Sequence, residues 1–363
     1  MISTKSTQND CQYCSVISQN NGEDPIGTAG SYDHWLILEL KQPWPGNMWV
    51  DDEKIQPLTK RLKQLIFRKG IILRPIAIAP DREYSQPGYA RLFYYRRSKQ
   101  LCSSYEKQEF LVPQDQLIPL ATAIADSLMR KSNSLETWEP YRQQSSEIRE
   151  MLVCTHANVD LACGRFGYPV YKKLRSDYTN NPEKPLRVWR SSHFGGHKFA
   201  PTLIDLPRGQ YWGHLTLESL DTLVHQNGDA EDLRLLYRGW AGMGKFAQIV
   251  ERELWQQEGW SWFDLPKTAK VIKIKGKGVL PYIYQVLRFI PSRRVNLLLS
   301  FLAKKATVSW VRLEFIKDNV IKTYEAKVEI SGQVNSTGYS GKDITLRPVN
   351  QYCVTHLKDI STN

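Results

Sequence analysis

Two cysteines and two histidines in the middle of the chain have the residue types and the spacing of a metal site. Cys154 and Cys163 are followed by His193 and His197 in the order C-x8-C-x29-H-x3-H. Thiolate sulfur and imidazole nitrogen are ligands for zinc and for iron. The histidine pair encloses two glycines, 195–196, which disfavour a helix. We therefore expect the histidines to lie in a loop that converges on a bound group.

The spacing leaves two kinds of metal site open. One is a structural zinc ion held by two Cys and two His. The other is a [2Fe–2S] cluster with two thiolate and two imidazole ligands, as in Rieske centres. Zinc sites usually space a cysteine pair at C-x2–4-C, so the wider separation in this chain leaves room for a two-iron cluster without deciding the question.

The hydrophobic pattern predicts α/β elements that place these four residues at strand and helix ends. The cysteines fall where a strand over 150–154 ends and where a helix over 164–178 begins. A strand from 186 leads into the histidine loop. Further on, the pattern predicts short strands over 201–215 and helices over 216–228, 230–240 and 244–260.

Two more regions flank this unit. The N-terminal region reads as β-α-β-β-α, with strands over 35–40, 71–80 and 90–97 and helices over 55–70 and 116–131. The C-terminal region shows a β-hairpin pattern over 307–331. The expected fold class is α/β, with the following parts: an N-terminal arm over 1–30, an α/β domain over 31–135, a second α/β domain over 145–265 and a basic, β-rich region over 268–363.

The positive charge of the chain is concentrated in one segment. The 363 residues carry a formal net charge of +12, and residues 266–305 hold ten Lys and Arg with no Asp or Glu. Because the remainder is almost neutral, the composition argues against a nucleic-acid-binding protein. Three interpretations of 266–305 stay open: solvated charges on a folded surface, a surface for an anionic membrane, and a docking site for an acidic partner.

No apolar run is long enough for a transmembrane helix, and the first residues lack the apolar segment of a secretory signal. We therefore expect a cytoplasmic protein, in which cysteines serve as thiols or metal ligands rather than as a disulfide framework.

The stretches "VCTHANVDLACGRFGYPVYKKL", "RSSHFGGHKFAPTLIDLPRGQYWGHLT" and "YRGWAGMGKFAQIVERELWQQEGW" resemble the sucrase/ferredoxin-like family, and the resemblance covers roughly residues 10–265. It implies a thioredoxin-like [2Fe–2S] ferredoxin with Cys154, Cys163, His193 and His197 as the cluster ligands. It also implies that the N-terminal α/β domain is a thioredoxin-like domain without ligands. A sucrase activity draws no support, because no motif identifies the carboxylate pair of a glycosidase.

Charge predicts what such ligation does to a cluster. Two ferric ions, two sulfides, two thiolates and two neutral imidazoles sum to zero, whereas four thiolates would give a net charge of −2. A neutral cluster is easier to reduce, so we expect a potential within or near the Rieske range of roughly −150 to +300 mV. The potential should fall as the pH rises past the pKa of the bound imidazoles.

Several neighbouring residues are candidates for supporting roles. His156 is either a second-sphere partner of the ligands or a structural histidine. Arg190 and Lys198, beside the histidine loop, are either second-sphere residues that tune the site or solvated charges. Cys11 and Cys14 form a C-x-x-C pair, which is either a redox dithiol or incidental.

The predicted function is therefore that of an electron carrier with unidentified donor and acceptor proteins. The alternatives are a zinc-stabilised binding module without redox activity and a thiol–disulfide oxidoreductase.

Overall fold

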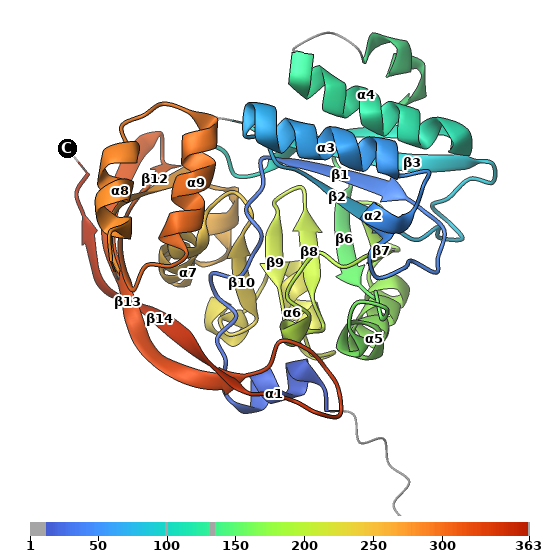
Figure 1. Ribbon diagram of the computed structural model, residues 1–363. Coiled ribbons are helices and arrows are strands. Elements are labelled where there is room, and N and C mark those ends of the chain that lie inside the picture. The colour runs from blue at the N-terminus through green and yellow to red at the C-terminus, as the bar shows by residue number, and fades with distance from the viewer. Residues whose placement is uncertain (1–11, 99–100, 131–134, 277, 362–363) are drawn as a thin grey trace, which may run out of the picture.

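The structure is a computed structural model that describes residues 12–98, 101–130, 135–276 and 278–361. Within these ranges the protein is mixed α/β, with one ten-stranded sheet and a separate four-stranded antiparallel sheet (Figure 1). The expected α/β class is confirmed at this level. No helix in the described ranges is long and apolar enough to cross a membrane.

The ten-stranded sheet consists of two α/β units with the same strand order. In each unit a parallel strand pair is joined by a helix and followed by two antiparallel strands and another helix. The first unit comprises β1 (His34–Glu39), α2 (Met48–Asp51), α3 (Gln56–Lys69), β2 (Leu73–Ile78), β3 (Tyr89–Arg97), β4 (Tyr105–Pro113) and α4 (Leu117–Arg130). The second unit comprises β6 (Arg149–Cys154), α5 (Leu161–Asp177), β7 (Leu186–Ser191), β8 (Leu203–Leu206), β9 (Gln210–Trp212), α6 (Ser219–His225) and α7 (Lys245–Glu258).

Two short strands, β5 (Arg142–Gln143) and β10 (Tyr237–Trp240), extend the sheet at its two outer edges. A helix predicted over 230–240 is wrong, because this stretch forms a short 3-10 turn followed by β10. All four residues of β10 are buried, and Gly239 has a φ of 122°, which does not fit a helix.

The two units meet edge to edge at a single residue pair. Ile78 at the end of β2 pairs with Ser191 at the end of β7, and beyond this point the two strands separate. Side chains from both units then pack into one shared core, which includes Trp35 and Phe93 from the first unit and Trp189 from the second. The stretches that the sequence assigned to separate domains, 31–135 and 145–265, thus contribute strands to one sheet.

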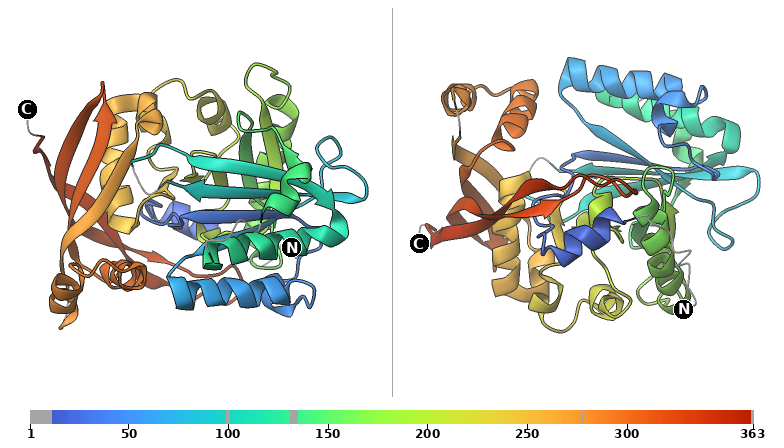
Figure 2. Two further views of the ribbon diagram at one scale, coloured as in Figure 1. Left: turned by 90° about the horizontal axis from the view of Figure 1, so that it is seen from above. Right: turned by 60° about the horizontal axis from the view of Figure 1, so that its bottom comes forward.

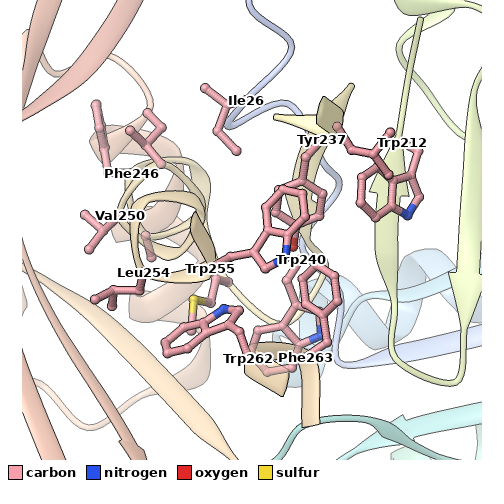
Figure 3. Close-up of a cluster of buried hydrophobic side chains, with 14 of the residues drawn as sticks. Ile26, Trp212, Tyr237, Trp240, Phe246, Val250, Leu254, Trp255, Trp262 and Phe263 are labelled. Atoms are coloured by element: carbon pink, nitrogen blue, oxygen red, sulfur yellow. The ribbon is translucent and has the colours of Figure 1, made fainter. Parts of the chain in front are cut away.

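The helices follow from simple sequence signals. In α3, Leu58, Leu62 and Leu65 lie on one buried face, and the helix ends at Gly70 in a left-handed conformation with a φ of 65°. By contrast, α7 is buried on more than one side, because it lies between the second unit and the C-terminal sheet. Figure 3 shows Trp255 of α7 among the aromatic side chains that fill this space.

The C-terminal region contains four strands in the order β11 (Lys267–Lys275), β12 (Val308–Lys317), β13 (Val320–Ser336) and β14 (Arg347–Asp359). The predicted hairpin is confirmed as β12 and β13, whose turn places Asp318 and Asn319 at positive φ. Two helices lie in the connection between the paired strands β11 and β12, namely α8 (Leu280–Leu287) and α9 (Arg293–Ala303). The sequence did not predict these helices, since their apolar residues do not form a single stripe.

The long strands β13 and β14 extend beyond the rest of the C-terminal sheet, so their connection, residues 337–346, lies beside α1 (Cys14–Asn20) (Figures 1 and 2). There Gln12 and Gly341 form an isolated β-bridge. Segments from the two ends of the chain therefore meet beside the second α/β unit.

Candidate metal centre

The parallel strands β6 and β7 bring the cysteine and histidine segments to the same edge of the sheet. Cys154, the last residue of β6, is in register with Ser191, the last residue of β7. Carboxyl ends of parallel strands open at one edge, where ligands bind in α/β folds. The histidine loop that follows Ser191 therefore starts next to Cys154.

The second cysteine reaches the same point because α5 begins close to the end of β6. Asp160 caps α5 by accepting a hydrogen bond from the backbone N–H of Ala162, and Cys163 follows in the first turn. A Cβ atom at Gly167 would overlap the carbonyl oxygen of Cys154, so only glycine permits this approach. The close contact holds Cys163 near Cys154.

The two sulfurs and one imidazole converge on a single point. His193 Nδ1 lies 3.8 Å from the Sγ of Cys154 and 3.7 Å from the Sγ of Cys163. The three ligand atoms all lie within 4.8 Å of one another, so they could hold one metal ion. Both cysteines are fully buried, whereas His193 is half-buried.

The electrostatics of the cysteine pair favour one thiolate. Burial disfavours the charged form of Cys154, but hydrogen bonds from Cys163 and His193 outweigh it and place the pKa of Cys154 well below its usual value. The hydrogen bond to Cys154, together with burial, raises the pKa of Cys163 well above its usual value. A thiolate is the form that binds metals, and a bound cation would allow the second thiol to ionise as well.

The histidine loop turns over a buried arginine. Gly195 and Gly196 have φ values of 103° and 83°, and a Cβ at Gly196 would overlap the guanidinium of Arg238. That guanidinium donates hydrogen bonds to the carbonyl oxygens of Gly195 and Thr28, at 3.0 Å each. Burial lowers the pKa of Arg238 to about 10. The loop thus depends on both glycines and places a positive charge behind the site.

His197 lies beside His193, but its ring faces a second group of possible ligand side chains. Its ring centroid lies 5.4 Å from that of His193, and its Nδ1 lies 3.3 Å from an Asp160 carboxylate oxygen and 3.5 Å from Cys14 Sγ. Cys14, Asp160 and His197 form another set whose ligand atoms all lie within 4.8 Å of one another. The four predicted ligands are therefore neighbours, with three converging directly and His197 turned toward Asp160.

The connection between β13 and β14 packs against the group formed by Cys14, Asp160 and His197. Ser340 donates hydrogen bonds to Asp160 from its backbone N–H, at 2.9 Å, and from its hydroxyl, at 2.7 Å. The Tyr339 ring stacks on the His197 ring with centroids 5.1 Å apart. Burial disfavours ionisation of Asp160, but the hydrogen bonds from His197 and Ser340 outweigh it and lower its pKa below the usual value. Asp160 is thus a carboxylate that faces His197.

The three residues predicted around the ligands take different positions. His156 is buried and accepts a hydrogen bond at Nδ1 from the backbone N–H of His193, while its Nε2 lies 3.0 Å from the carbonyl oxygen of Trp44. Arg190 instead lies over the Tyr171 ring. Lys198 pairs with the buried carboxylate of Glu23. Of the three, His156 is the one that contacts a ligand segment.

Sequence reasoning missed several residues of the site. Asp160 carried only the weak signal of a polar residue before a helix, and Arg238 and Ser340 lie far along the chain from the motif. Cys14 was seen only as part of a C-x-x-C pair, whose first member, Cys11, lies outside the described residues. Burial raises the pKa of Cys14 to about 12, so it is a neutral thiol here.

Fold and site together define a mixed α/β protein with a Cys/His group at a strand edge that could hold a metal ion. The profile of the sucrase/ferredoxin-like family matches residues 25–239, which is more than half of the chain. The chain therefore belongs to the sucrase/ferredoxin-like family. A search of curated proteins finds no significant match.

Two solved structures are similar to a short part of the chain. They are the wild-type thioredoxin-like [2Fe–2S] ferredoxin from Aquifex aeolicus and a cysteine-to-serine variant of it. Each is 15% identical and covers 22% of this chain and 85% of the ferredoxin chain, with a TM-score of 0.20.

Proposed function

We propose that this protein transfers single electrons by means of a [2Fe–2S] cluster bound to Cys154, Cys163, His193 and His197. The observation that carries the proposal is the convergence of Cys154, Cys163 and His193 on one point, with the His197 ring beside His193. Membership of the sucrase/ferredoxin-like family supports an iron–sulfur or redox role.

The donor set fits such a cluster. Two thiolates and two imidazoles are the ligands of Rieske-type centres, in which the imidazoles share one of the two irons. Both sulfurs are buried here, while both imidazoles are half-buried. The thiolate side therefore faces the protein interior, and the histidine side lies nearer the surface.

A bound cluster would supply the capacity to accept and release one electron. The protein's own residues set the conditions for that step. Asp160 accepts a hydrogen bond from His197 Nδ1, which leaves Nε2 of this ring free as a metal ligand. The buried charge of Arg238 behind the loop favours the more negative, reduced state.

We also infer that each α/β unit is thioredoxin-like. A parallel βαβ segment followed by an antiparallel ββα segment, with the first strand between the second and the third, is the arrangement of thioredoxin-like domains. Both units have this order. In this interpretation the second unit binds the cluster, and the first has no Cys or His in the connections 40–55 and 79–88 that correspond to the ligand segments.

The two alternative functions use the same residues differently. A structural zinc ion would also accept two Cys and two His ligands. A thiol–disulfide oxidoreductase, using Cys11 and Cys14 or Cys154 and Cys163, needs a reactive, accessible thiolate. Cys14, Cys154 and Cys163 are all buried, and the pKa of Cys14 is raised to about 12. The metal content therefore separates the main proposal from its strongest rival.

The test is the metal and acid-labile sulfide content of protein purified without oxygen, together with its visible spectrum. We expect about two iron and two sulfide per chain and a red-brown colour that bleaches on reduction. Cys154→Ser and Cys163→Ser should lose iron and colour. Cys353→Ser, which changes a half-buried thiol in the C-terminal sheet, should retain both. One zinc per chain without sulfide would overturn the proposal.

A further inference from the structure

The helices α8 and α9 carry an apolar surface that the rest of the described chain leaves open. They lie side by side at one end of the molecule (Figure 1). Of the 20 large hydrophobic side chains that are exposed in the described residues, eight lie between 279 and 301. These eight form what we call the helical patch: Val279, Tyr282, Ile283, Val286, Phe289, Ile290, Leu298 and Phe301.

The helical patch is the outward side of α8, of α9 and of the residues that adjoin α8, and α8 is apolar on both sides. Their inward side is anchored in the core by Tyr284, Leu299 and Leu302, which are all buried. The exposed side presents Tyr282 of α8 and, in the connection between the two helices, Phe289, which are 77% and 73% exposed. No charged residue occurs from 279 to 287. A helix that is apolar all round is normally covered on all sides, so the helical patch calls for an apolar partner.

The surroundings of the helical patch are strongly basic. The chain carries no Asp or Glu between Asp264 and Glu314. None of the exposed cations in this stretch forms an ion pair within the described chain. Two of the patch rings have a cation beside them, since Arg288 lies 4.7 Å from the Phe289 ring centroid and Lys305 lies 4.9 Å from that of Phe301. The exposed cations are Lys270, Lys273, Lys275, Arg288, Arg293, Arg294, Lys304 and Lys305.

We propose that the helical patch binds the surface of an anionic lipid bilayer. Aromatic and aliphatic tips bordered by Lys and Arg match the boundary between acyl chains and negatively charged headgroups. An acidic protein would match the charge, but it would have to supply an apolar surface as well. A second copy of the chain would bring the same positive charge, which disfavours self-association.

The helix lengths decide how the patch lies on the bilayer. With eight and eleven residues, α8 and α9 are about 12 and 16 Å long, whereas the hydrocarbon core is about 30 Å thick. They are too short to span it. They therefore lie along the surface, with the apolar tips inserted and the cations at headgroup level. The inference is independent of the cluster, because the patch shares no residue with the metal site.

The test is flotation of the full-length protein with vesicles of phosphatidylcholine alone and of phosphatidylcholine mixed with phosphatidylglycerol. We expect binding to the mixed vesicles and little binding to the neutral ones. The double variant Phe289→Ser/Phe301→Ser should bind the mixed vesicles roughly 100-fold more weakly, because two rings no longer enter the bilayer. The double variant Val320→Ser/Ile321→Ser, at the exposed β12–β13 turn, is its matched control and should bind like wild type.

A charge-reversal double variant tests the electrostatic contribution to membrane binding with little risk to folding. Lys304→Glu/Lys305→Glu should weaken binding by roughly 30-fold, whereas Lys172→Glu/Lys184→Glu, with the same change in net charge, should not. Equal binding to both kinds of vesicle, or wild-type binding by the phenylalanine variant, would overturn the proposal. So would a failure to float combined with a dimer that Phe289→Ser abolishes, since a second copy would then be the occupant.

Discussion

The two α/β units have the same strand order, yet among the described residues the second unit is the one that gathers Cys and His side chains able to hold a metal ion. In the first unit β1 ends at Glu39, and residues 40–55 separate it from α3. In the second unit β6 ends at Cys154, and only residues 155–160 precede α5. The short connection brings the first turn of α5 against the strand end. The comparison teaches that the fold provides an open strand edge in both units. The second unit adds a short connection and Cys and His residues at that edge, whereas residues 40–55 and 79–88 of the first unit contain neither residue type.

The first unit supports the site of the second from outside. Its connection after β1 contributes the carbonyl oxygen of Trp44, which lies 3.0 Å from His156 Nε2 and accepts a hydrogen bond of 2.7 Å from Asn158 Nδ2. His156 in turn accepts a hydrogen bond from the backbone of His193. The longer connection of the first unit is therefore linked through His156 to the histidine loop of the second unit.

The largest effect is expected where buried charges link the two units. Lys107 and Glu109 on β4 face Glu150 on β6 and Arg187 on β7, with a Lys107–Glu150 distance of 2.7 Å and an Arg187–Glu109 distance of 2.6 Å. Burial disfavours ionisation of Glu109, but Arg187 outweighs it and lowers its pKa to about 2. Glu109→Gln should leave Arg91 without its carboxylate partner and Lys107 and Arg187 with Glu150 alone. We expect it to lower the free energy of unfolding by about 3–5 kcal/mol.

Denaturant unfolding measures this effect. Glu106→Gln is the matched control on the same strand, because its pair with Arg96 is solvent-exposed and should contribute less than about 1 kcal/mol. A single transition that shifts as a whole would show that the units unfold together. Equal shifts for Glu109→Gln and Glu106→Gln would contradict the role of the buried network.

The sequence predicted the elements around the metal site better than it predicted how the units combine. The alternation of helices and strands, and the grouping of Cys154, Cys163 and His193, follow from local periodicity and from the parallel pairing of β6 with β7. The shared sheet does not, because one antiparallel residue pair between β2 and β7 leaves no local signal. The approach of Ser340 to Asp160 depends on the curvature of long strands, which no short pattern encodes.

A second prediction concerns the stability at acid pH, because each unit buries a histidine whose pKa is lowered. Burial lowers the pKa of His34 and of His214 to about 4. The unfolded chain takes up these protons near pH 6.5, whereas the folded chain takes them up only near pH 4. Stability is therefore complete above pH 6.5 and falls as the pH drops toward 4, by about 3 kcal/mol for each histidine.

The free energy of unfolding, measured between pH 7 and pH 4, tests the contribution of the histidine in the second unit. His214→Asn should remove the contribution of the second unit, and asparagine tolerates the positive φ of 52° at this position. His225→Asn, in an exposed position on α6, should leave the slope unchanged. An acid slope that His214→Asn does not reduce would show that this histidine is not the group that titrates.

A third prediction tests the close approach that distinguishes the second unit. Gly167→Ala places a methyl group against the carbonyl oxygen of Cys154, so α5 must move outward. We expect a loss of about 3 kcal/mol in stability and a lower metal content, since Cys163 moves with the helix. Gly332→Ala is the control, because the space around Gly332 is open. Unchanged metal content in Gly167→Ala would mean that convergence does not depend on this contact.

The smallest effect tests whether Asp160 positions His197. Asparagine keeps the helix cap, because its side-chain oxygen also accepts the hydrogen bond from Ala162, but it loses the carboxylate that faces His197 Nδ1. Asp160→Asn should therefore fold normally and retain bound metal roughly tenfold less well against a chelator. Asp229→Asn, which caps a 3-10 turn by the same kind of hydrogen bond, is the matched control. If Asp160→Asn retains metal as well as wild type does, Asp160 acts only as a helix cap and does not orient His197. The orientation of His197 would then not be one of the features that distinguish the second unit from the first.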